Sequence, residues 1–102
     1  MSGIIVRLIP GALTNPDLDI RRVLPDLIVA RSGGAIRDDG YDYASDGVAL
    51  LLFLRADRPV EAVASVLDVI ENIRVLGNDL RRAAVVTVEE AGQSEVVYPR
   101  AS

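Results

Sequence analysis

The feature that most constrains the fold is an uninterrupted apolar run of seven residues, 48–54, in a chain of 102 residues. The run is too continuous for a strand with one wet face, and it is far shorter than the ~20 residues that span a bilayer. It predicts a central β-strand that is covered on at least one face and lies between neighbouring strands. The rest of the sequence must therefore supply the neighbouring strands and the elements that cover this face.

Four other segments are candidates for strands beside this one. Residues 4–9 form a short β-branched run, and residues 84–88 and 95–98 are two further runs separated by a hairpin turn over residues 91–94. Residues 35–44 are polar and poorly patterned, which indicates an edge strand or an extended loop. A sheet of several short strands is therefore expected.

Two segments show the periodicity of amphipathic helices. The first is expected to begin at Pro16, and its apolar side chains recur at helical spacing over residues 20–28. Pro25 interrupts this stripe, and because an internal proline costs about 3 kcal/mol we expect a kink or a stop near Leu24. The second helix is expected over residues 59–76, where the apolar spacing is regular.

The predicted order of elements is strand, helix, strand, strand, helix, strand, followed by an added C-terminal strand. This α+β pattern resembles the ferredoxin-like plait (βαββαβ), an antiparallel sheet with two helices on one face. The resemblance covers roughly residues 3–99 and rests on no family-specific motif, and the missing cysteines exclude the iron–sulfur members. We expect a single globular domain over residues 1–102.

The composition excludes several kinds of chemistry. Histidine and cysteine are absent and all eleven basic residues are arginine, so Ser-His and Cys-His nucleophiles, Schiff-base lysines and the commonest zinc sites cannot form. The net charge of −4 argues against a basic face for nucleic acid. Neighbouring carboxylates such as Glu89 and Glu90 point to opposite faces of an extended strand, so they do not converge on one substrate. We expect no catalytic residue and no cofactor.

Residues 38–47 form the most unusual stretch, with four aspartates and two tyrosines in ten residues and no basic residue. In a strand, Tyr41 and Tyr43 share one face and Asp42 points to the other. Three interpretations are open: a loop for a hard cation, a charged edge that prevents aggregation, and a surface for a partner. The spacing does not match the EF-hand loop, because the glutamate expected at its twelfth position is missing, and we expect no metal site.

Our working hypothesis assigns partner binding to this segment, because tyrosine is a favoured interface residue and the aspartates would attract a basic protein. For any single aspartate, a protective edge is the simpler interpretation. The predicted binding residues are Asp38, Asp39, Tyr41, Asp42, Tyr43 and Asp46.

The functional expectation is a small, acidic, non-catalytic protein-binding module of the immunity-protein, antitoxin or regulatory-subunit type. The alternative is a small dimeric plait enzyme or ligand sensor that uses carboxylates on the open sheet face. Because half of this short chain is apolar, we also expect a homodimer formed through the open face or an edge strand. The first residues lack the layout of a signal peptide, so a cytoplasmic protein with no membrane partner is expected.

Overall fold

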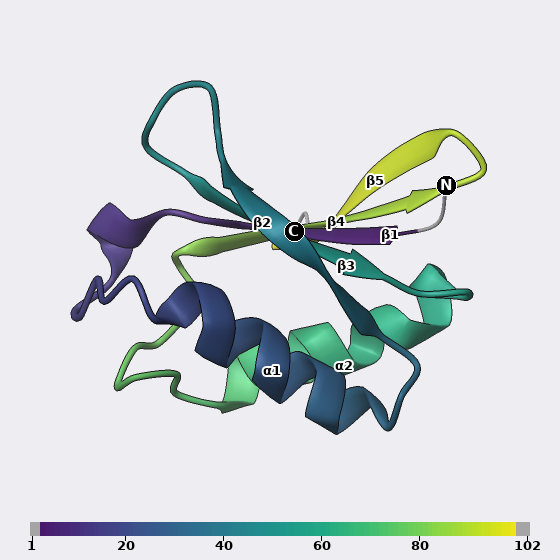
Figure 1. The fold of residues 1–102 in the computed structure, drawn as a ribbon, viewed down its shortest axis with the longest axis horizontal. Coiled ribbons are helices and arrows are strands. Elements are labelled where there is room, and N and C mark those ends of the chain that lie inside the picture. Colours follow the sequence, from purple (N-terminus) through teal and green to yellow (C-terminus); the bar gives the residue numbers. More distant parts are fainter. Residues whose placement is uncertain (1–2, 100–102) are drawn as a thin grey trace.

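The structure, a computed structural model, describes residues 3–99 and has an α+β architecture with one five-stranded antiparallel sheet and two α-helices (Figure 1). The strands are β1 (Gly3–Leu8), β2 (Arg37–Tyr43), β3 (Leu50–Arg55), β4 (Ala84–Glu90) and β5 (Gln93–Tyr98). The helices are the short η1 (Pro10–Ala12), α1 (Ile20–Ser32) and α2 (Pro59–Asn72). The expected class and element order are confirmed, while both ends of the expected domain, residues 1–2 and 100–102, lie outside the described residues.

The strand order in the sheet is β2-β3-β1-β4-β5, and all neighbouring strands are antiparallel. The central position of β1 gives it a partner on each side, and β3, which contains most of the apolar run, lies between β2 and β1. The polar strand β2 is an edge strand, as its sequence predicts. The fifth strand continues the sheet beyond β4, so the arrangement is plait-like with one strand more than a simple four-stranded plait.

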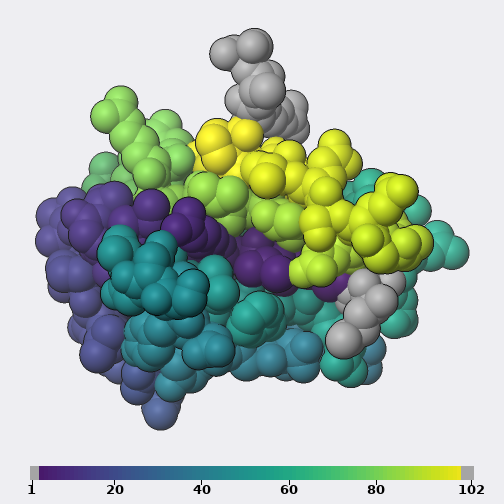
Figure 2. All heavy atoms as spheres, turned by 90° about the horizontal axis from the view of Figure 1, so that it is seen from above, coloured from purple at the N-terminus to yellow at the C-terminus, as the bar shows by residue number. Residues whose placement is uncertain are grey.

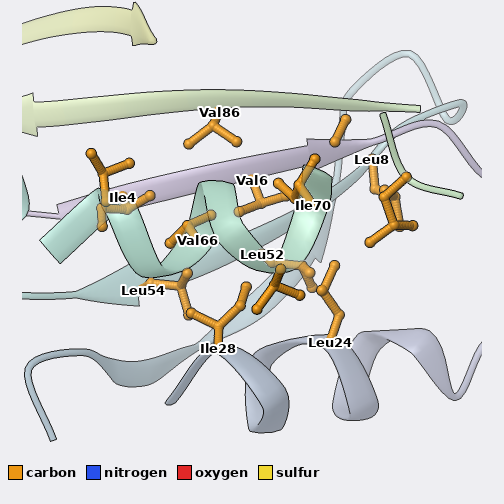
Figure 3. Packing of buried hydrophobic residues seen from close by; sticks show 14 of the residues in the cluster. Ile4, Val6, Leu8, Leu24, Ile28, Leu52, Leu54, Val66, Ile70 and Val86 are labelled. Carbon is orange, nitrogen blue, oxygen red and sulfur yellow. The ribbon is translucent and has the colours of Figure 1, made fainter. Parts of the chain in front are cut away.

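The core lies between the sheet and the two helices, which cover the same face of the sheet (Figure 1). Alternate residues of β1, β3 and β4 are buried there, and Val6 lies between its register partners Leu52 and Val86. Leu24 of α1 and Val66 of α2 are also fully buried and pack towards this row (Figure 3). Each such side chain stabilises the fold by about 1.5–3 kcal/mol through removal from water.

The first helix differs from its predicted course at both its start and its proline. It begins at Ile20 rather than at Pro16, because the Asp17 carboxylate accepts a hydrogen bond from the Asp19 N–H (2.9 Å) and holds a turn before the helix. A kink or a stop is expected near Leu24, and of these two the stop is wrong, since α1 continues through Pro25 to Ser32. Pro25 is buried, so the packing of its face offsets the hydrogen bond that its nitrogen cannot make.

The second helix ends at Asn72, four residues earlier than predicted. A tight turn follows, in which Val75 and Asn78 form a bridge. The buried Asn78 amide bonds to both backbone groups of Asn15, accepting from its N–H and donating to its C=O at 2.7 Å each. This long-range contact ties together the loop before α1 and the turn after α2.

The β4–β5 connection is also shorter than expected. It consists of Ala91 and Gly92, which have φ of 55° and 80°. Positive φ at both central residues is the mark of a type I′ turn, whose twist matches that of the flanking strands. The prediction of a four-residue turn over residues 91–94 is therefore wrong, and β5 begins at Gln93.

The packing of α2 predicts different outcomes for one substitution at two positions of that helix. Val66→Ala removes two methyl groups from a fully buried site and should lower the free energy of unfolding by about 2 kcal/mol. Val60 is 64% exposed, so Val60→Ala should change the free energy of unfolding by a few tenths of a kcal/mol at most. Urea unfolding curves measure both, and equal destabilisation by the two variants would contradict the assigned helix face.

Candidate functional site

The six predicted site residues lie along one edge of the sheet, on β2 and in the turn that follows it. All seven residues of β2 are exposed, so none of their side chains is needed for the core. The structure nevertheless divides the six between the two faces of the sheet. Their distribution is set by a β-bulge within β2.

The bulge lies between Asp38 and Tyr41, which pair with Leu54 and Leu52 of β3. Since both leucines point into the core, Asp38 and Tyr41 lie on the helix-covered side of the sheet. Gly40 has a φ of 96°, a conformation that other residues rarely adopt, and its N–H donates to the Asp38 carboxylate at 2.9 Å. Asp38 therefore stabilises the bulge, which reduces its freedom to act as a ligand.

Tyr41 and Tyr43 share one strand face, as predicted, and their rings touch edge to face with centroids 6.2 Å apart. The guanidinium of Arg21 on α1 lies over the Tyr41 ring, with its central carbon 5.3 Å from the ring centroid. Aromatic and cation–π contacts of this kind contribute about 0.5–1.5 kcal/mol each. Even so, the tyrosines remain 45% and 49% exposed, and we call Tyr41, Tyr43 and Arg21 the tyrosine patch.

Asp39 and Asp42 lie on the opposite, open side of the sheet. Asp42 pairs with Leu51, whose side chain is directed away from the core, and its carboxylate accepts a hydrogen bond from the Tyr43 N–H at 2.8 Å. Asp39 forms an ion pair with Arg55 at 3.5 Å. The structure therefore does not bring these two carboxylates and the tyrosines into one continuous surface.

Asp46 has a structural role in the β2–β3 turn. Its carboxylate accepts hydrogen bonds from the N–H groups of Val48 (2.9 Å) and Ala49 (3.3 Å) and forms an ion pair with Arg7 at 3.1 Å. These backbone bonds, with the arginine charge as a smaller contribution, lower the pKa of Asp46 below its ordinary value. Of the predicted site residues, the tyrosines are therefore the ones whose polar and aromatic surface remains most available.

The geometry of the segment does not support cation binding. Its aspartates lie on two faces and in a turn, and within residues 3–99 no three histidine, cysteine, aspartate or glutamate side chains are placed to hold a metal ion. The loop interpretation left open by the sequence thus has no converging set of oxygen ligands.

A cleft of about 640 Å³ lies between the end of α1 and the start of α2. Its lining comprises Ser32, Gly34, Ala35, Arg37, Asp57, Arg58, Glu61, Ala62 and Ser65. The charged groups pair with each other, Arg37 with Asp57 at 3.8 Å and Arg58 with Glu61 at 3.6 Å, and all four are largely exposed. The volume suits a small molecule, but a ligand site also needs a few fixed polar groups in a desolvated setting. This cleft provides no such group.

Arg21 is the part of the tyrosine patch that the sequence does not reveal. Nothing in the helical pattern marks this arginine as different from its neighbour Arg22, and the contact arises only because α1 begins beside the end of β2. The crossover from β1 through α1 to β2 could have suggested that proximity, although not the particular side chain.

No family model, curated protein or solved structure matches the chain. In the part of the chain that the structure describes, no helix is long and apolar enough to cross a membrane. The function must therefore be argued from the surfaces themselves, and the tyrosine patch is the strongest of them.

The contacts of Asp46 predict a pH-dependent stability. Because its pKa is lowered in the folded state, its contribution is present above the ordinary aspartate pKa of about 3.9 and is lost as pH falls through the lower folded value. Asp46→Asn keeps an oxygen acceptor for the turn but removes the charge. We expect it to lower the Tm at pH 7 and to have a smaller effect near pH 2. Thermal unfolding followed by circular dichroism measures this, and an equal Tm difference at both pH values would refute the assignment.

Proposed function

We propose that the protein is a non-catalytic binding module that docks on another protein through the tyrosine patch. The observation that carries this proposal is the half-exposed pair Tyr41–Tyr43, held edge to face on a strand that contributes nothing to the core. Tyrosine and arginine are enriched among the residues that dominate binding energy, and the patch contains both. The unused half of each ring is the surface that a partner would bury.

The contacts within the patch also favour binding because they reduce its cost. Arg21 over Tyr41, and Tyr41 against Tyr43, restrict side chains that would otherwise have to be ordered by the partner. Asp38 lies on the same face of β2, and Asp42 borders the strand from the other face. These carboxylates form an acidic rim that would favour a basic partner surface.

The same proposal includes the finer description of the fold. We infer a ferredoxin-like plait formed by β1 to β4, with β5 added at the edge beside β4. In support, β1 lies between β3 and β4, and each strand–helix–strand connection passes over one intervening strand. A small acidic plait of this size suits an immunity-protein, antitoxin or regulatory-subunit role, in which a compact domain acts by covering a partner.

A second candidate is a ligand sensor or enzyme that uses carboxylates on the open sheet face. One observation favours it: a hollow bordered by Asp39, Arg55 and Glu89, with Ile5 and Phe53 among its apolar residues. The volume of this hollow is about 160 Å³, whereas ligand pockets start at about 300 Å³. The tyrosine patch is therefore the better supported site.

The test compares the wild-type protein with the double variant Tyr41→Ser/Tyr43→Ser in affinity capture from a lysate of the source organism. Removal of each anchoring ring should cost about 2 kcal/mol of binding free energy, which corresponds to roughly thirtyfold in affinity. We therefore expect recovery of the specific partner by the double variant to fall at least thirtyfold. Quantitative mass spectrometry of the captured proteins measures this, after circular dichroism has confirmed that the variant is folded.

Two matched controls accompany this experiment. Val60→Ser removes exposed apolar surface on α2, and Glu90→Gln removes an exposed charge at the end of β4, away from β2; both should leave capture of the partner within about twofold. A folded double variant that recovers the partner as well as the wild type would contradict the proposal. Loss of capture by Val60→Ser alone would place the binding surface on α2 instead.

A further inference from the structure

The face of the sheet opposite the helices carries a second surface, independent of the tyrosine patch. Figure 2 looks onto this face, with β1 as a purple band between the β2–β3 side in teal and the β4–β5 side in green and yellow. The register of β1 with its two neighbours arranges its side chains in three rows across the sheet. The rows are Glu89–Gly3–Arg55, Thr87–Ile5–Phe53 and Val85–Arg7–Leu51.

The rows show a distribution of charge that is complementary to itself. In the first row, the acidic Glu89 on β4 and the basic Arg55 on β3 lie on either side of Gly3, and Arg55, which remains half exposed, also pairs with Asp39 of its own chain at 3.5 Å. The second row is mostly apolar, and the only charge of the third, Arg7, is already neutralised by Asp46 at 3.1 Å. A rotation by 180° about an axis along β1 exchanges the β3 and β4 sides of every row and leaves the rows in place.

We propose that a second copy of this chain covers the open face, related to the first by a two-fold axis nearly parallel to β1. In this arrangement Glu89 of each copy faces Arg55 of the other, so that each Arg55 gains a second carboxylate beside its own Asp39. In the remaining rows Ile5 and Arg7 each face their own equivalents, the charge of each Arg7 being paired with Asp46 of its own chain, and Val85 faces Leu51 of the other copy. Such an isologous contact closes on itself, as most protein dimers do.

The shape of the sheet agrees with this symmetry. The β2–β3 turn lies at the Leu8 end of the sheet and the β4–β5 turn at the Gly3 end, so the two hairpin tips are at diagonal corners. Both tips rise on the side away from the helices (Figure 1). The two-fold rotation exchanges the sides of the sheet but not its ends. Each tip of one copy therefore meets a corner of the other copy that has no tip.

The area is sufficient for association, but not for a very tight dimer. Five strands of about six residues give a face of roughly 24 Å by 20 Å, or about 500 Å² per copy. A pair of copies then buries about 1,000 Å², the lower limit for a specific interface. The dimer should accordingly form at micromolar protein concentration. This proposal does not depend on the proposed function, because Tyr41 and Tyr43 lie on the other face of the sheet.

The test uses two charge-reversal variants, Arg55→Glu and Glu89→Arg, in sedimentation velocity at 100 µM protein. In each variant alone, both inter-copy pairs become like-charged, so each should sediment with the single-chain mass of 10.9 kDa. In an equimolar mixture, a mixed dimer has opposite charges at both contacts. We expect the mixture to recover at least tenfold tighter association than either variant alone, and the wild type to show twice the single-chain mass.

Circular dichroism first establishes that both variants fold, and Phe53→Ala provides a second, uncharged test that should weaken self-association about tenfold. The double variant Tyr41→Ser/Tyr43→Ser should remain dimeric, which separates this proposal from the proposed function. A wild-type mass of 10.9 kDa at 100 µM would overturn the dimer. A wild-type dimer that neither charge reversal weakens, or a mixture that stays monomeric, would overturn the proposed two-fold geometry.

Discussion

One-sided coverage of the sheet is the constraint on which the rest of this structure depends. Both helices lie on the same face, so each inner strand must direct alternate side chains into the core and the others away from it. The register holds this division constant across three strands, as in the fully buried row Leu52–Val6–Val86. A shift of one residue in any of these strands would expose its core residues to water, which specifies the pairing strongly.

The edge strand β2 shows what happens when that alternation is interrupted. Strict alternation from Asp38 would place Tyr41 and Tyr43 on the open face and Asp42 on the helix side. The bulge at Gly40, stabilised by the Asp38 carboxylate, reverses this order and turns both rings towards Arg21. One additional residue in an edge strand therefore decides which face of the domain carries its exposed aromatic side chains.

The sequence allows the elements, their order and the edge position of β2 to be predicted because these depend on local periodicity and polarity. Helix ends are harder to predict: α2 ends at Asn72, and the following turn is held by hydrogen bonds between Asn78 and the distant Asn15, a contact that no local pattern shows. The candidate site was predicted as one contiguous segment, but its division between two faces depends on the β2–β3 register. A run of residues shows which side chains are close in sequence, whereas a bulge determines which of them share a surface.

The two proposed surfaces belong to opposite faces of the same sheet and therefore do not compete. β2 contributes to both, because Asp42 borders the open face while Tyr41 and Tyr43 lie on the helix side. Pairing of two copies through the open face would leave both tyrosine patches outside the contact, one at each β2 edge. A partner that itself presents two sites would then bind both patches of the assembly, and its apparent affinity would rise through effective concentration without any new contact. Weak self-association through about 1,000 Å² is enough for this effect, because each bound partner also stabilises the pair.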